Sequence, residues 1–215
     1  GRHPAGAVGV KLILVRHGLS EANQRAVVTG TPDDPLSPVG VAQVQDTRHL
    51  LTDAGFHPEQ CFVSHWKRAR ESAAWVAPGK VFHIDARLGE TNAGEVAEWP
   101  LARFLEAYSG FYSDHRRPYP GGESHEQLNE RVLAWLEEVR RLSEGKLVLA
   151  VTHAGPIACL LQHALGIPME RFPALLARNA SLSVIEYGPA APRGKVLAFS
   201  QSPAETLRDL IGLPT

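Results

Sequence analysis

Two short, almost continuous apolar runs constrain the fold most strongly. They are Val10–Arg16 (VKLILVR) and Leu147–Thr152 (LVLAVT), and both are rich in branched side chains. Runs of this length predict strands that are buried on both faces of a sheet. Two similar runs, Cys61–Ser64 and Val81–Ile84, predict further strands. Because segments with helical spacing separate these strands, we expect an α/β fold with a mostly parallel sheet in a three-layer α/β/α sandwich.

Apolar positions at helical spacing, bounded by Pro and Gly, predict five helices. The first has Ser37 as its N-cap and Pro38 as its first residue. The two last apolar runs, Leu182–Tyr187 and Lys195–Ser200, flank a turn and predict a hairpin that gives the sheet an antiparallel edge strand. The predicted helices span residues 38–54, 66–76, 101–112, 124–143 and 155–165.

The chain length of 215 residues favours one domain over residues 10–202, preceded by a loose lead-in (1–9) and followed by a C-terminal tail (203–215). A net charge of −1 argues against nucleic acid or anionic membranes as partners. The sequence has no apolar run long enough for a membrane span. Cys61 and Cys159 fall in apolar segments, so we expect buried free thiols and a cytoplasmic location. The sequence leaves a homodimer open.

Polar side chains follow three of the predicted strands at the points where they end. The first strand is followed by Arg16, His17 and Gly18, the second by a segment that contains Arg68, and the late central strand by His153. Ligands bind beyond the carboxyl ends of parallel strands, so these groups are expected to converge. Arginine forks bind phosphate, and a neutral histidine can attack phosphorus. The pattern therefore predicts an oxyanion pocket suited to phosphoryl transfer.

Transfer to oxygen also needs a proton donor, and Glu90, just beyond the third strand, is the natural candidate. A metal site is the rival use of the two histidines. The chain has no H-x-H or H-E-x-x-H spacing and no cysteine cluster, so we expect no metal and no other cofactor. The four tryptophans, Trp66 among them, are expected to be packing residues.

The stretch Leu14–Asn23 (LVRHGLSEAN) resembles the RHG signature of the histidine phosphatase superfamily, which includes the cofactor-dependent phosphoglycerate mutases. Further segments resemble the family in the same order along the chain. R-H-G alone is a weak signal, whereas the ordered set is specific. These segments are Leu36–Gln43, Ser64–Ala73, Leu88–Glu90, Pro120–Ser124 (PGGES), Val151–Gly155 and Arg178–Ser181.

The resemblance implies a role for each matching residue. His17 would be the nucleophile that becomes phosphohistidine, and Arg16, Arg68 and His153 would bind the phosphoryl group and act in catalysis. Asn23 and the backbone N–H of Ala154 would add donors, and Glu90 would protonate the leaving oxygen and then help to activate water. Substrate contacts are expected at Ser20, Thr29, Gly30, Arg116 and Arg117.

Three alternatives stay open at this point. The favoured function is a phosphatase acting on a small phosphorylated metabolite. The PGGES segment is typical of the family's phosphatases, and its mutases usually carry a longer insertion than the one between Glu90 and Gly121. A mutase and a non-catalytic phospho-ligand-binding relative are the other two functions. The identity of the proton donor is also open. The position at which the family has a later glutamate is Ala97 in this chain, and Glu95 and Glu98 lie close to it in the sequence.

Overall fold

Six strands form one sheet in the order β3-β2-β4-β1-β5-β6 in a computed structural model that describes residues 9–202. Strands β1 to β4 run parallel to one another, whereas β5 is antiparallel to β1 and to the edge strand β6. The mostly parallel sheet with an antiparallel edge is therefore confirmed. The strands are β1 (Val10–Arg16), β2 (Gln60–Val63), β3 (Phe82–Ile84), β4 (Leu147–Thr152), β5 (Leu182–Tyr187) and β6 (Lys195–Gln201).

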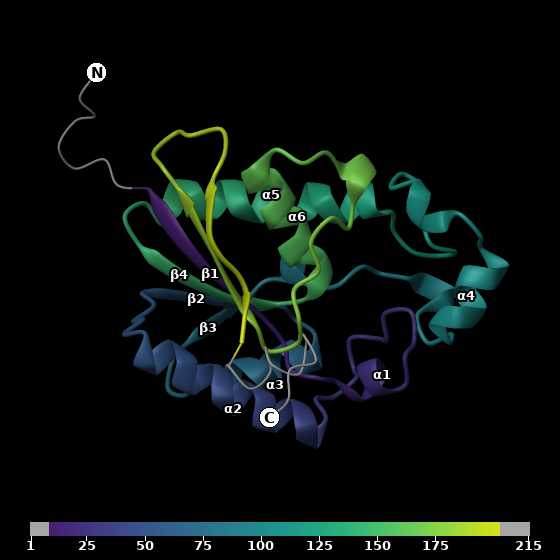
Figure 1. Ribbon diagram of the computed structural model, residues 1–215, viewed down its shortest axis with the longest axis horizontal. Helices are drawn as coiled ribbons and strands as arrows, with labels where there is room; N and C mark the ends of the chain where they lie inside the picture. The colour runs from purple at the N-terminus through teal and green to yellow at the C-terminus, as the bar shows by residue number, and fades with distance from the viewer. Residues whose placement is uncertain (1–8, 203–215) are drawn as a thin grey trace, which may run out of the picture.

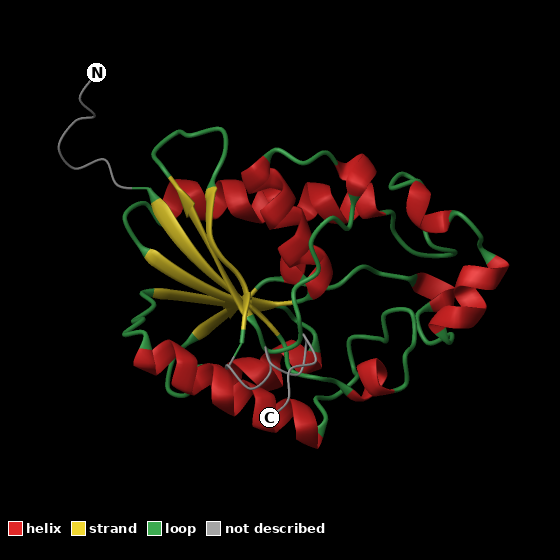
Figure 2. Cartoon of the chain, in the orientation of Figure 1, coloured by secondary structure: helices red, strands yellow, loops and turns green. Residues whose placement is uncertain are grey.

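Helices cover both faces of this sheet, as Figures 1 and 2 show. Leu12 and Leu14 of β1 face α5 and α6, whereas the alternate residues Ile13 and Val15 face α2 and α3. This two-residue alternation places a separate apolar core on each side of β1. The helices are α1 (Glu21–Gln24), α2 (Pro38–Asp53), α3 (Lys67–Val76), α4 (Leu101–Ala107), α5 (His125–Leu142) and α6 (Ala154–Leu165).

Serine caps fix the starts of the two longest helices. The Ser37 hydroxyl accepts a hydrogen bond from the backbone N–H of Gly40 at 3.0 Å, and Pro38 occupies the first helical position, as predicted. Ser124 and Gln127 form a reciprocal capping box at the start of α5. Such a cap stabilises a helix by about 1 kcal/mol.

The segment between β3 and α5 differs most from the prediction. The helix expected over residues 101–112 ends at Ala107, since Tyr108 already leaves the helical conformation with φ of −122° and ψ of 56°, and Gly110 then adopts a left-handed conformation with φ of 76°. A 3₁₀ turn, η3 (Phe111–Ser113), follows. Phe104, Phe111 and Tyr119 then pack into a third, smaller apolar cluster. Phe104 belongs to α4, which lies beside the main sandwich in Figure 1.

Three more 3₁₀ turns, which the sequence patterns did not predict, complete the elements: η1 (Ala86–Leu88), η2 (Gly94–Val96) and η4 (Met169–Arg171). Within residues 9–202, no helix combines the length and the apolar character that a membrane span needs. The predicted tail (203–215), and all of the predicted lead-in except Gly9, lie outside the described residues. The single-domain boundaries stay a prediction.

Candidate active site

The parallel register of β1, β2 and β4 brings three strand ends to one place. Arg16 pairs with Thr152, and Val63 with Val151, so the next residues along each chain segment, His17, Ser64 and His153, are neighbours. The backbone N–H of His17 donates to the Thr152 carbonyl at 3.0 Å. The two imidazole rings lie edge to face with their centroids 5.0 Å apart. The predicted convergence of the two histidines is therefore what the sheet produces.

His17 is held in the protonation state that a nucleophile needs. Its ring is 1% exposed, and Nδ1 lies 2.6 Å from the carbonyl oxygen of Gly18. A carbonyl oxygen only accepts, so Nδ1 carries the proton and Nε2 keeps its lone pair. Burial, helped by the charges of Arg68 and Arg16, lowers the pKa of His17 well below its ordinary value. His17 is therefore a neutral imidazole at physiological pH.

His153 is fully buried and has the opposite orientation. Its Nε2 lies 2.8 Å from the Ser64 hydroxyl, which already accepts from the backbone N–H of Trp66. The serine hydroxyl can donate to Nε2, and with that donation the ring proton of His153 is on Nδ1. Within residues 9–202, this Nδ1 has no hydrogen-bond partner. Burial is the main cause that lowers the pKa of His153, with smaller contributions from the neighbouring His17 ring and the arginines.

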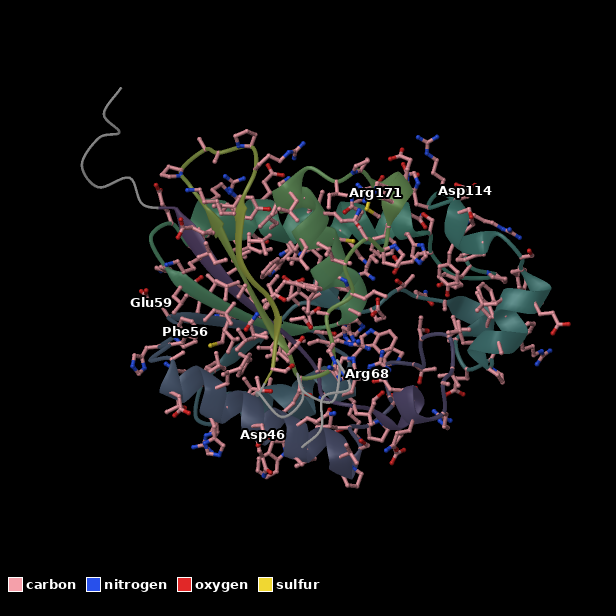
Figure 3. All side chains as sticks on the ribbon, in the orientation of Figure 1. Asp46, Phe56, Glu59, Arg68, Asp114 and Arg171 are labelled. Carbon is pink, nitrogen blue, oxygen red and sulfur yellow. The ribbon has the colours of Figure 1, made fainter. Side chains whose placement is uncertain are left out.

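Arg16 and Arg68 place buried cationic donors beside the two imidazoles. Arg68 is 3% exposed, yet its Nε and Nη1 have no hydrogen-bond partner among the described residues, nor does Nε of Arg16. Burial lowers the pKa of Arg68 to about 10, so the guanidinium keeps its charge. Figure 3 shows Arg68 beside a group of nitrogen-bearing side chains near α1. Buried donors normally have partners, so this cluster has the character of an anion-binding site.

The loop after β1 supplies Asn23 in a fixed orientation. Asn23 Oδ1 accepts from the backbone N–H of Ser20 at 3.1 Å and from Nδ2 of Asn179 at 3.2 Å. With its oxygen occupied in this way, the amide NH₂ remains as the donor. Ser20 caps α1 through its hydroxyl, which makes it a structural residue of this loop. Its expected role in substrate contact stays a prediction.

Glycine allows the same loop to approach α2. A Cβ on Gly18 would lie 2.5 Å from the carbonyl oxygen of Gly40, a distance that no side chain tolerates. The backbone N–H of Gly18 donates to the Ser72 hydroxyl of α3 at 3.1 Å, and Ser72 in turn donates to the Arg68 carbonyl. The loop after His17 is thereby tied to α3, the helix that carries Arg68.

Glu90 lies at the N-terminus of α6. One of its carboxylate oxygens accepts from the backbone N–H of Gly155 at 3.2 Å and the other from that of Thr91 at 2.9 Å. A Cβ on Gly155 would lie 2.2 Å from Glu90 Oε1, so glycine is needed there. The charge of Glu90 raises the pKa values of both Arg16 and Arg68, against the larger effect of burial. The carboxylate is therefore near both guanidinium groups.

Arg131 of α5 fixes the loop that carries Glu90. Its guanidinium donates to the carbonyl oxygens of Arg87, Gly89 and Glu90 at 2.9, 2.8 and 3.0 Å. It also makes two bonds to the carboxylate of Glu123, at 2.6 and 3.2 Å. Sequence reasoning missed Arg131, because nothing in the spacing of α5 distinguishes it from a solvated arginine.

Two further contacts at the site were also missed. Ser64 orients His153, although the sequence marks it only as part of a resembling segment. Trp66, expected to be a packing residue, lies 5.1 Å from the His153 ring and 4.8 Å from the guanidinium of Arg68. An aromatic face at this distance stabilises the buried cation.

The remaining predicted residues divide into two groups. Ala154 begins α6 directly after His153, and Gly30 packs against Arg68. The backbone N–H groups of Thr29 and Gly30 both donate to the Ala97 carbonyl. The two other residues lie in the loop after η3. There, Arg116 pairs with Glu126 at 3.7 Å, and Arg117 packs over Tyr108 and Phe111. Asp114 of this loop is well separated from Arg68 in Figure 3. Substrate contact by Arg116 and Arg117 stays a prediction.

Glu95 and Glu98 are separated from the cluster by their own contacts. Glu95 packs beside Gly121, and Glu98 is half exposed and lies 3.7 Å from Arg25. No group of three or more His, Cys, Asp or Glu side chains within residues 9–202 has the geometry of a metal site.

Together, a buried neutral histidine, two arginines with unpartnered donors among the described residues and a nearby carboxylate form the kind of cluster expected of a phosphoryl-binding site. The family model of the histidine phosphatase superfamily (branch 1) matches residues 12–199 of the chain. The chain therefore belongs to this superfamily.

Individual relatives include both mutases and phosphatases. The chain is 29% identical over 189 residues to a probable phosphoglycerate mutase GpmB of Shigella boydii, and the match covers 83% of this chain and 85% of the relative. A mycobacterial glucosyl-3-phosphoglycerate phosphatase with VO₃ superposes with a TM-score of 0.78 at 25% identity, and the match covers 89% of this chain and 99% of that one. The α-ribazole phosphatase of Shigella flexneri superposes with a TM-score of 0.79 at 22% identity. The match covers 89% of this chain and 96% of that one, and it shows the shared fold.

Proposed function

We propose that this protein is a phosphatase that hydrolyses a small phosphorylated metabolite through a phosphohistidine on His17. The observation that carries the proposal is the set of buried, unpartnered donors of Arg16, Arg68 and His153 around a neutral His17, as far as residues 9–202 are concerned. An anion with several acceptor oxygens satisfies all of these donors at once. Such a site stabilises the charge that develops on a transferring phosphoryl group.

In the first step, Nε2 of His17 attacks phosphorus and the bond to the ester oxygen breaks. Glu90 donates its proton to that oxygen, so the alcohol leaves in neutral form. The guanidinium groups and the Nδ1 proton of His153 bind the phosphoryl oxygens during the transfer. The hydrogen bond from Nδ1 of His17 to Gly18 supports the positive charge that forms on the imidazole.

In the second step, the Glu90 carboxylate accepts a proton from water, and the resulting hydroxide attacks the phosphohistidine. Inorganic phosphate forms and the imidazole returns to its neutral state. The protein's own cations balance the phosphate charge, so the proposal requires no metal.

The test is hydrolysis of a generic aryl phosphate in the presence of a chelator. We expect release of inorganic phosphate by the unaltered protein and its loss in His17→Ala. As a matched control, His163→Ala removes a histidine of α6 that pairs with Tyr187 instead of the site, and it should retain the activity. Full activity of His17→Ala would refute the phosphohistidine mechanism.

A mutase is the second candidate, and the specific observation in its favour is the similarity to the probable phosphoglycerate mutase. The same site would return the phosphoryl group to a sugar acid instead of water. Supplying 3-phosphoglycerate with a bisphosphorylated primer separates the two functions. Conversion to 2-phosphoglycerate well above the rate of phosphate release would reverse our ranking.

A further inference from the structure

A pocket of about 330 Å³ lies directly beside the proposed phosphate site. Glu90 forms part of its wall, and Trp66 connects it to the cluster by contacting both His153 and Arg68. Gly30, also in the wall, is so close to Arg68 that a Cβ there would lie 3.1 Å from Nη1. If Glu90 protonates the leaving oxygen, the leaving group extends past Glu90 into this pocket. The inference below therefore rests on the proposed function.

The wall of this pocket has no cation that is free to bind an anion. Within residues 9–202, Arg131 is the one lysine or arginine that lines it. A guanidinium has five N–H donors. All five donors of Arg131 have acceptors, three of which are carbonyl oxygens and two of which are carboxylate oxygens of Glu123. No donor of Arg131 remains for a ligand, and its charge is balanced by Glu123.

The other titratable groups give the pocket a negative balance. Glu90 adds one carboxylate without an ion-pair partner among the described residues. His65 is exposed at the wall, and burial together with the charges of Arg131 and Arg70 lowers its pKa, which favours the neutral ring at pH 7.5. The remaining polar groups, such as Thr31 and Asn92, are uncharged, and Trp66 and Ala97 supply apolar surface.

We infer that the substrate is the phosphate ester of an uncharged hydroxyl compound of about the size of a sugar. A volume of about 330 Å³ is at the lower end of the range for ligand pockets, roughly 300–1,000 Å³. A carboxylate or a second phosphate on the leaving group would find no free cation among the described residues of this wall. The lack of a free cation among the described residues of the wall distinguishes the chain from a protein that binds phosphoglycerate-type esters.

The first experiment compares two aryl phosphates that differ chiefly in charge, 4-carbamoylphenyl phosphate and 4-carboxyphenyl phosphate. The amide and the carboxylate have the same shape. We expect kcat/KM for the amide to exceed that for the carboxylate by about tenfold or more, because a carboxylate that enters a wall without a free cation stays unpaired, which costs at least the free energy of one decade. Glycerol 3-phosphate and 3-phosphoglycerate form an aliphatic pair with the same expected preference.

The second experiment places a cation in the wall. Ala86 lines the pocket and is exposed, so lysine fits there without disturbing a core. Ala86→Lys should raise the carboxylate-to-amide ratio of kcat/KM by about two- to fivefold, as expected for an exposed ion pair. The matched control Ala86→Gln, of similar length and without charge, should leave that ratio unchanged.

The outcomes separate the two proposals. Equal kcat/KM values for the amide and the carboxylate, or a preference for the carboxylate, would overturn the inference and leave the phosphatase function in place. Failure to hydrolyse either aryl ester would refute the phosphatase function itself.

Discussion

Replacement of Glu90 by glutamine tests the proposed acid most directly. The amide keeps the length of the side chain and one acceptor oxygen, so one of the two bonds from the backbone N–H groups of Thr91 and Gly155 can persist. It cannot deliver a proton. General acid catalysis contributes about 10²–10⁴-fold, which corresponds to about 2.7–5.5 kcal/mol in the activation free energy. We expect a loss of this size in kcat for an alkyl phosphate.

The size of the loss should depend on the leaving group. Nitrophenolate is a stable anion that leaves without protonation, so Glu90→Gln should reduce kcat for nitrophenyl phosphate by less than about tenfold. Steady-state kinetics on glycerol 3-phosphate and nitrophenyl phosphate measures both values. Glu95→Gln and Glu98→Gln are matched controls, since both carboxylates lie at other contacts. A severe loss in either control, or an equal loss for both esters in Glu90→Gln, would show that the acid is misassigned.

Three further results are expected. Inorganic phosphate at ten times its Kd should stabilise the protein by about 1.4 kcal/mol, a rise in Tm of about 3–6 °C by calorimetry, and Arg68→Gln should abolish that rise. Arg131→Gln should lower kcat for an alkyl ester about tenfold or more with little change in KM, because the Glu90 loop loses its anchor. Arg140→Gln, on the same helix but bound to the Ala191 carbonyl, should not change kcat. Burial lowers the pKa values of His17 and His153 and keeps both rings neutral in the folded protein. Below pH 6.5 the same two histidines therefore bind protons in the unfolded chain but not in the folded protein. The free energy of unfolding should therefore fall as the pH drops below 6.5, by up to about 1.4 kcal/mol per pH unit for each histidine, and urea titrations at pH 7.5, 6.5 and 5.5 measure this fall.

The sequence predicted the sheet well because its signals are local. An apolar run such as Leu147–Thr152 needs burial on both faces, and a Ser-Pro pair starts a helix wherever it lies in the fold. The same logic located the candidate site, since parallel strands must end at one edge and His17 and His153 each follow a strand. Only at Tyr108 and Gly110 did a local feature, a non-helical backbone inside an apparently helical pattern, shorten a predicted helix.

By itself, then, the sequence determined the layers, the strand ends and the residue types gathered there, because periodicity and turn residues act over a few neighbours. The tertiary structure alone decided how those residues are used. The partner of Glu90 at Gly155, the full occupation of Arg131 by groups from two loops, and the burial that makes His17 neutral all depend on segments far apart in the chain. Whether a side-chain N–H donor already has a partner depends on which acceptors the fold brings within hydrogen-bond distance. No local sequence pattern encodes that distance.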